Sequence, residues 1–341
     1  MRKLLTVILV VVLLKQISFC YALSPDSFFE SVRNIPLTAE EVIALIEKGK
    51  FTDKEIFIFD YDGTLALKKK PIQAKTIKAL LKLIDMGKTV IIVSNGDIKR
   101  LQADIDNSLL EDGTRFVDKL SGNKHIWVFE GRGGGAYKVN SNGYKKHPEL
   151  SISFAEDKIR RVADLLTSVE NKFNELGVKL KLFSSETMIF IRFSLRDKTK
   201  IAEILDYLKR GAKERQHNLS EKNGPFIDEE PFAMDLEGNK GVDVEKIYYH
   251  AWFVSTDKGS VIERKIVPIL GAGDMSKASY YGDSFKNPGD SDVEVQDVVG
   301  LQTIDVENPE NTLRIIEKYI EWANSSKTPD NSLQNLLSIG A

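Results

Sequence analysis

The segment from residue 55 to residue 65 reads Glu-Ile-Phe-Ile-Phe-Asp-Tyr-Asp-Gly-Thr-Leu. Its apolar run of strand formers, Ile56–Phe59, predicts a central strand that is covered on both faces rather than a half-exposed edge strand. The strand ends at two acids one residue apart, Asp60 and Asp62, and Gly63 permits a tight turn after them. In an open parallel sheet, ligands bind beyond the carboxyl ends of the strands, so these acids are the first candidates for a functional site.

The pattern around this segment predicts an α/β fold built on a parallel sheet. A helix with an apolar stripe follows, and two more buried strands are expected at Val90–Val93 and Trp127–Phe129. The glycine cluster at residues 131–135 then changes the character of the chain, and a long helix, two strand-like runs and another helix predict an inserted α+β unit. The parallel pattern is expected to resume with a strand at 232–236 and a helix from about residue 242.

The expected organisation therefore has six parts. They are a signal peptide (1–22), an N-terminal helical extension (23–50), the first part of the parallel-sheet core (51–130), the inserted α+β unit (131–231), the second part of the core (232–322) and a flexible tail (323–341). In the extension, Thr38 and Glu41 have the spacing of a capping box, which predicts the start of a helix.

The composition and charge balance of the chain indicate which class of molecule it is expected to bind. The chain has 341 residues and is 42% apolar, as is ordinary for a soluble globular protein, and 48 Lys and Arg residues nearly balance 50 Asp and Glu residues. No global charge favours nucleic acid or an anionic membrane surface. A small polar molecule is the expected partner.

The N-terminus has the features of a secretory signal. Arg2 and Lys3 precede an unbroken apolar run to Leu14, and Lys15 ends it before it is long enough to span a bilayer comfortably. We expect cleavage near Ala22 and a secreted or periplasmic protein, with an uncleaved membrane anchor as the alternative. The single cysteine, at position 20, lies inside this segment, so the mature chain is expected to have no disulfide.

Polar residues follow the other strands as well. The second strand leads into Ser94-Asn95-Gly96-Asp97, and Lys240 stands at the start of a predicted helix, with Lys222 and Lys246 as nearby substitutes. The fourth group is Gly282-Asp283-Ser284, followed by two further acids at positions 290 and 292.

In this order, Asp-Tyr-Asp-Gly-Thr-Leu, Ser94, Lys240 and Gly282-Asp283 resemble the motifs of the haloacid dehalogenase superfamily of phosphatases and mutases, over about residues 51–317. The position of the insertion resembles the branch with a C2-type cap. That branch includes trehalose-phosphate and sucrose-phosphate phosphatases, Cof-type phosphatases and phosphomannomutase. The resemblance implies a Rossmann-like core with an α+β lid, and magnesium-dependent phosphoryl transfer.

The resemblance also implies a role for each motif residue. Asp60 would attack phosphorus and become an aspartyl phosphate, while Asp62 would protonate the leaving alcohol and then activate water. Ser94, Asn95 and Lys240 would hold the phosphoryl oxygens.

Mg²⁺ would be bound by Asp60, Asp283, a second acid of the fourth motif and the backbone carbonyl of Asp62. The second acid is open between Asp290 and Asp292. Residues 287–294 resemble the longer phosphomannomutase version of this motif, which favours Asp292.

Three further residues are candidate substrate contacts. Glu130 and Arg132 flank the start of the glycine cluster, where the lid of the family begins, and a solvent-facing pair is the alternative. Arg192 lies within an apolar strand-like run, from which it either faces the active site or extends to solvent from the cap sheet. The four histidines have no metal-ligand spacing.

The expected function is that of a phosphatase acting on a small phosphate ester. The family resemblance alone implies that this ester is a sugar phosphate resembling trehalose 6-phosphate, and that the lid selects the substrate. One alternative is a sugar phosphomutase, which the resemblance of residues 288–294 motivates. The other is a non-catalytic phospho-ligand binding protein, which the irregular fourth motif motivates.

Overall fold

The computed structural model describes the larger, α/β part of the chain almost completely and the inserted part in pieces. The described residues are 34–152, 156–174, 179–184, 188–195, 203, 204, 207, 210, 226–232, 247–254, 257–270, 273–286 and 292–326. The predicted signal peptide at 1–22 lies outside them. Among the helices of these ranges, none is long and apolar enough to cross a bilayer.

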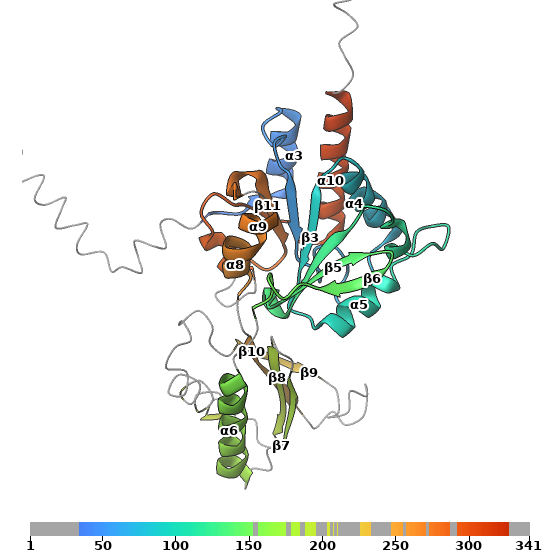
Figure 1. The fold of residues 1–341 in the computed structure, drawn as a ribbon. Helices are drawn as coiled ribbons and strands as arrows, with labels where there is room; N and C mark the ends of the chain where they lie inside the picture. Colours follow the sequence, from blue (N-terminus) through green and yellow to red (C-terminus); the bar gives the residue numbers. More distant parts are fainter. Residues whose placement is uncertain are drawn as a thin grey trace, which may run out of the picture.

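An eight-stranded sheet forms the core (Figure 1). Its strands, in spatial order, are β1 (Leu37–Thr38), β12 (Gln302–Asp305), β11 (Ala278–Gly282), β2 (Ile56–Phe59), β3 (Thr89–Val93), β4 (Ile126–Glu130), β5 (Gly135–Asn140) and β6 (Gly143–Lys146). The strands from β1 to β4 pair in parallel, and β5 and β6 add an antiparallel edge. The prediction of an α/β fold on a parallel sheet is confirmed.

The central strand β2 is covered on both faces, as its sequence predicts. Phe57 and Phe59 belong to one apolar core and Ile56 and Ile58 to the other, and all four side chains are at most 1% exposed. Successive side chains of a strand point to opposite faces, so an unbroken apolar run requires two cores.

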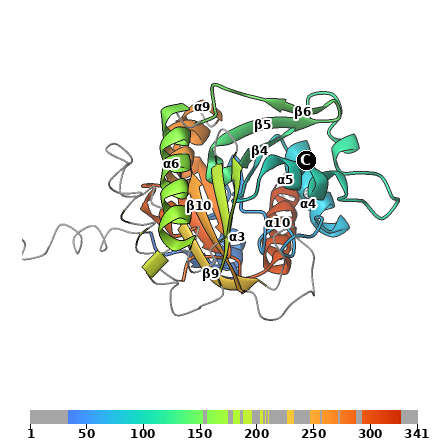
Figure 2. The same ribbon diagram turned by 90° about the horizontal axis from the view of Figure 1, so that it is seen from below.

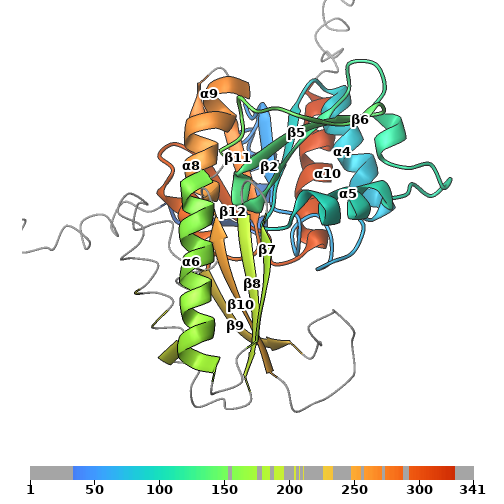
Figure 3. The ribbon, with the colours of Figure 1, turned by 60° about the horizontal axis from the view of Figure 1, so that its bottom comes forward.

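Helices form both outer layers (Figure 3). The first core is closed by α3 (Ala39–Glu47), α4 (Ala74–Asp85), α5 (Ile98–Asp106) and α10 (Pro309–Ser325). The second is closed by α8 (Lys258–Val261), a π-helical turn (Ile262–Ile266) and α9 (Val267–Leu270). Short 3₁₀ turns lie at Val117–Lys119 (η1), Gly131–Gly133 (η2), Met275–Lys277 (η7) and Val293–Asp297 (η8).

A second, four-stranded antiparallel sheet lies beyond the large one, with α6 (Glu156–Phe173) beside it (Figure 2). Its order is β7 (Lys179–Ser184), β8 (Met188–Leu195), β10 (Ile247–Val254) and β9 (Phe226–Phe232).

The extent of the insertion differs from the expected 131–231 at both ends. The glycine turn after β4 reverses the chain within the large sheet, so β5 and β6, over residues 135–146, remain part of the core. At the other end, β9 and β10 pair with each other in the small sheet, and the core resumes only after residue 254. Residues 233–246, where the helix from residue 242 is expected, lie outside the described residues. The last helix runs to Ser325, past the start of the expected tail at 323.

The predicted capping box at the start of α3 is confirmed. The Glu41 amide donates to the Thr38 hydroxyl oxygen over 3.3 Å, and the Thr38 amide donates to the Glu41 carboxylate over 2.8 Å. These two bonds satisfy amides that an α-helix leaves without an internal partner at its start.

Replacement of Thr38 by alanine is expected to lower the free energy of unfolding by about 1 kcal/mol, because one amide of the first turn loses its acceptor. Urea denaturation of the variant and the wild type measures it. Thr52→Ala is the matched control, since Thr52 caps no described helix. An equal loss in both variants would contradict the proposed role of the cap.

Candidate active site

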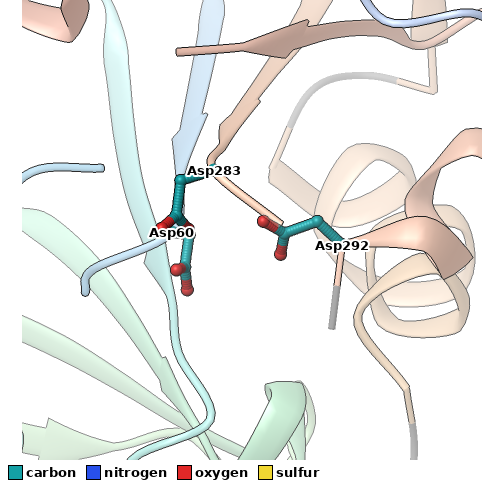
Figure 4. A group of neighbouring side chains, drawn as sticks. All are labelled: Asp60, Asp283 and Asp292. Atoms are coloured by element: carbon teal, nitrogen blue, oxygen red, sulfur yellow. The ribbon is translucent and has the colours of Figure 1, made fainter. Parts of the chain in front are cut away.

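Three carboxylates meet at the carboxyl ends of neighbouring strands (Figure 4). Asp60 follows β2, Asp283 follows β11 and Asp292 immediately precedes η8. One oxygen from each lies within 4.8 Å of the others. Asp60 and Asp292 are buried and Asp283 is partly buried. Because β11 and β2 are paired in parallel, their carboxyl ends bring the first two acids together.

A lysine ammonium lies between two of these acids. Lys258, at the start of α8, is fully buried, and its Nζ donates to Asp60 Oδ1 over 2.7 Å and to Asp292 Oδ1 over 2.6 Å. Asp292 also accepts from the Tyr280 hydroxyl at 2.7 Å and from the Ser284 amide at 3.1 Å. The position of Asp292 is thus fixed by three residues, one from α8, one from β11 and one from the loop that follows β11.

The cluster contains more negative than positive charge. Burial raises the pKa of Asp60 to about 7, although the Lys258 ammonium opposes this rise, and the neighbouring carboxylates add to it. Burial and the nearby Asp292 also raise the pKa of Asp283. A divalent cation would relieve this repulsion, and carboxylate oxygens are the ligands that Mg²⁺ prefers. The residues present therefore fit a magnesium site made by Asp60, Asp283 and Asp292.

A glycine permits the close approach of Asp283. Gly63 has φ +84°, and a side chain there would overlap the Asp283 carboxylate. The tight turn that the sequence predicts at this position therefore also provides room for an acid from another strand.

Ser94 and Asn95 lie at the same edge of the sheet, at the end of β3. Ser94 is buried, its hydroxyl oxygen accepts from the Gly96 amide at 3.0 Å, and its amide donates to the Phe129 carbonyl at the end of β4. Asn95 is exposed. Since β2 and β3 are paired, the Ser94 loop adjoins the Asp60 loop.

The Asp62 side chain has different partners from Asp60. Arg100, in α5, donates to Asp62 Oδ1 over 3.0 Å and to Oδ2 over 2.5 Å, and the Lys69 amide donates to Oδ1 over 2.8 Å. Burial acts to raise the pKa of Asp62, but these hydrogen bonds outweigh it and hold that pKa below its ordinary value. The carboxylate of Asp62 is not one of the three that cluster.

Comparison with solved structures shows what fold this is. No family model and no curated protein matches the chain. The IMP-bound, N-terminally truncated IMP-nucleotidase of Plasmodium falciparum matches with 15% identity and a TM-score of 0.53, over 82% of this chain and 70% of that one. Trehalose-6-phosphate phosphatase of Aspergillus fumigatus matches with 13% identity and a TM-score of 0.50, over 84% and 99%.

The chain has the haloacid dehalogenase fold. The fold that the motif resemblance implied is confirmed, and at identities this low the likeness concerns the fold alone. Within this fold, the site occupies the edge at which the motif residues Asp60, Ser94 and Asp283 were expected to meet.

The phosphate-binding lysine expected from the sequence is not described. Lys240, like its alternatives Lys222 and Lys246, lies outside the described residues, and the haloacid dehalogenase core instead brings Lys258 to Asp60. Sequence reasoning missed Lys258, although a signal was present. It begins a second Lys-Gly pair, and Val261, Ile262 and Ile266 follow at helical spacing.

The remaining candidates are distributed as follows. Asp292 joins the cluster, whereas Asp290 lies outside the described residues. Glu130 and Arg132 are each 4% exposed, so neither belongs to a solvent-facing pair. Glu130 accepts from the Ile98 amide at the start of α5. Arg192 is in β8, opposite His250 of β10, and its side chain lies outside the description.

Lys258→Met is expected to lower the free energy of unfolding at pH 7 by about 3 to 5 kcal/mol, because two buried carboxylates then face each other without their cation. The folded-state pKa of Asp60 lies above its unfolded value, so proton uptake favours the folded state. The loss should therefore be smallest in acid and grow as the pH rises through about 7.

Urea denaturation at pH 5 and pH 8, without divalent metal, measures this effect. Lys240→Met is the control. An equal loss of stability in Lys240→Met would contradict the assignment of Lys258 as the buried partner of the two acids.

Arg100→Gln is expected to raise the pKa of Asp62 relative to the wild type, since burial remains after the guanidinium is lost. Gly96→Ala should have the same effect without removing the charge, because a methyl group there would meet the end of the Arg100 side chain. Carboxyl-carbon NMR titration measures the pKa. Arg115→Gln, which breaks an exposed pair with Asp118, should leave Asp62 unchanged.

Proposed function

We propose that this chain is a Mg²⁺-dependent phosphatase that hydrolyses a small phosphate ester through an aspartyl phosphate on Asp60. The observation that carries the proposal is the cluster of three carboxylates at the carboxyl edge of the parallel sheet, two of which are buried and paired with the Lys258 ammonium. The haloacid dehalogenase fold of the chain supports it, because phosphatases have this fold.

In the first step, an oxygen of Asp60 forms a bond to phosphorus and the bond from phosphorus to the ester oxygen breaks. The leaving oxygen takes a proton from Asp62. The Lys258 ammonium, beside the attacking oxygen, offsets negative charge as the phosphoryl group arrives, and Ser94 provides a hydroxyl donor at the adjoining strand end. Bound Mg²⁺ would neutralise further charge on the phosphoryl oxygens.

In the second step, water attacks the phosphorus of the aspartyl phosphate and gives a proton to Asp62. The bond between phosphorus and Asp60 breaks, inorganic phosphate leaves, and both acids return to their starting states. Asp62 is paired with Arg100 in this structure, and that pairing favours the ionised carboxylate. To donate in the first step, Asp62 must therefore turn from α5 toward the phosphoryl group and take up a proton from solvent.

For the substrate, we propose a sugar phosphate resembling trehalose 6-phosphate. The support is the motif resemblance together with the likeness in fold to trehalose-6-phosphate phosphatase. A nucleoside monophosphate belongs in the same test, because IMP-nucleotidase has a similar fold. We also propose that the N-terminal segment directs export, which N-terminal sequencing of the mature chain would test.

Phosphate release by the chain without residues 1–22 tests the function. The panel contains sugar phosphates, nucleoside monophosphates and p-nitrophenyl phosphate, each with and without Mg²⁺. We expect metal-dependent release that Asp60→Asn lowers by about a thousand-fold or more, as is typical when a nucleophile is removed. Asp53→Asn, the same change at the opposite end of β2, should leave the rate unchanged.

Three results would count against this proposal. Full activity in Asp60→Asn would refute the nucleophile. Interconversion of sugar 1-phosphate and 6-phosphate without phosphate release would indicate the mutase. Mg²⁺ binding with no turnover on any ester would indicate a binding protein.

A further inference from the structure

The turn between β4 and β5 is unusual in placing an arginine among glycines. Gly131, Arg132 and Gly133 all have positive φ, of 56°, 62° and 104°. An L-residue with a side chain rarely adopts this conformation, so other interactions must favour arginine at this position. Its side chain is 5% exposed, which excludes ordinary solvation as the reason.

The backbone of this turn is bonded to the Ser94 loop. The Arg132 amide donates to the Ser94 carbonyl over 2.9 Å, and the Gly131 amide donates to the Gly96 carbonyl over 3.0 Å. The turn and the Ser94 loop therefore form one hydrogen-bonded unit at the carboxyl ends of β3 and β4.

The same turn packs directly on α8. A side chain at position 133 would overlap Val261, so the glycine there brings the turn against the helix that begins with Lys258. If the turn moved, its contact with Val261 would move α8 and therefore Lys258.

The Arg132 side chain completes the connection by reaching η8. Its guanidinium pairs with Glu294, with 3.1 Å between Nη2 and Oε1. Glu294 stands two residues after Asp292, and its backbone carbonyl packs so closely on Gly259 that position 259 has no room for a side chain. The Arg132–Glu294 ion pair therefore lies next to the contact between η8, which follows Asp292, and the start of α8.

We infer that the Arg132–Glu294 ion pair is a positioning pair that fixes Lys258 and Asp292 relative to the Ser94 loop. The sequence had suggested Arg132 as a substrate contact. In this inference Arg132 acts instead by positioning the residues that contact the substrate. The inference rests on the proposed function where it concerns turnover. It also makes a claim about the magnesium site that needs no substrate.

The test uses Arg132→Gln, Glu294→Gln, the double variant and the conservative Arg132→Lys. Arg314→Gln is the matched control, because Arg314 pairs with Glu40 at the same 3.1 Å but in an exposed position on the outer helices. Calorimetric titration with Mg²⁺ alone gives the metal affinity, thermal unfolding shows how much protein is folded, and steady-state kinetics give kcat and KM.

We expect each single glutamine variant to weaken Mg²⁺ binding and to lower kcat by about tenfold, which is typical when a residue that orients metal ligands is lost. KM should stay within about threefold of the wild type. The double variant should be no worse than the worse single one, because both remove the same interaction. Arg132→Lys should recover part of the loss, and Arg314→Gln should change neither quantity.

Two sets of results would overturn this inference and leave the proposed function standing. A raised KM with unchanged Mg²⁺ affinity in Arg132→Gln would make Arg132 a substrate contact, and Glu294→Gln would then behave like the wild type. A lower melting temperature with normal Mg²⁺ affinity and kcat per folded molecule would make the pair a stabilising contact only. A wild-type chain that neither binds Mg²⁺ nor releases phosphate would instead overturn both this inference and the proposed function.

Discussion

The ammonium of Lys258, held between Asp60 and Asp292, is the interaction on which the rest of the site depends. Burying one charge is costly, and burying several is tolerated only when they are paired and hydrogen-bonded. Lys258 offsets two of the three carboxylates, and Tyr280 and Ser284 supply further donors to Asp292. What remains is an excess of negative charge in a small volume, and this is the electrostatic setting in which a divalent cation binds well.

The sheet explains why these groups can meet although they are far apart in the sequence. Asp60 and Lys258 are separated by 198 positions, and the small four-stranded sheet lies between them in the chain. Parallel strands place all their carboxyl ends at one edge, so short segments after β2, β3 and β11 converge there. The two apolar cores on either face hold these strands in register, and the reactive groups can therefore stand on rigid supports.

Sequence reasoning succeeded where a local pattern and the chemistry coincide. The apolar run before Asp60 predicted a doubly covered strand, which placed this acid at the carboxyl edge of the sheet, and the structure has both. Sequence reasoning failed where one local pattern is compatible with two different structures. A glycine cluster is expected equally at a domain boundary and at a tight reversal between β4 and β5. Two Lys-Gly pairs open apolar segments, and only tertiary structure shows that the pair at Lys258 is buried against Asp60. The Arg100 partner of Asp62 lies 38 residues away and belongs to no motif, so no pattern could have found it.

The path of the chain out of the small sheet has a mechanical consequence. Strand β10 ends at Val254, and Lys258 is only four residues farther along. A tether this short transmits movement, since an extended chain spans no more than about 3.5 Å per residue. A displacement of β10 larger than this span allows would therefore have to displace Lys258, the ammonium paired with Asp60 and Asp292 in the described part of the chain. The position of the small sheet and the pairing of Lys258 with Asp60 and Asp292 are therefore linked through four residues of chain.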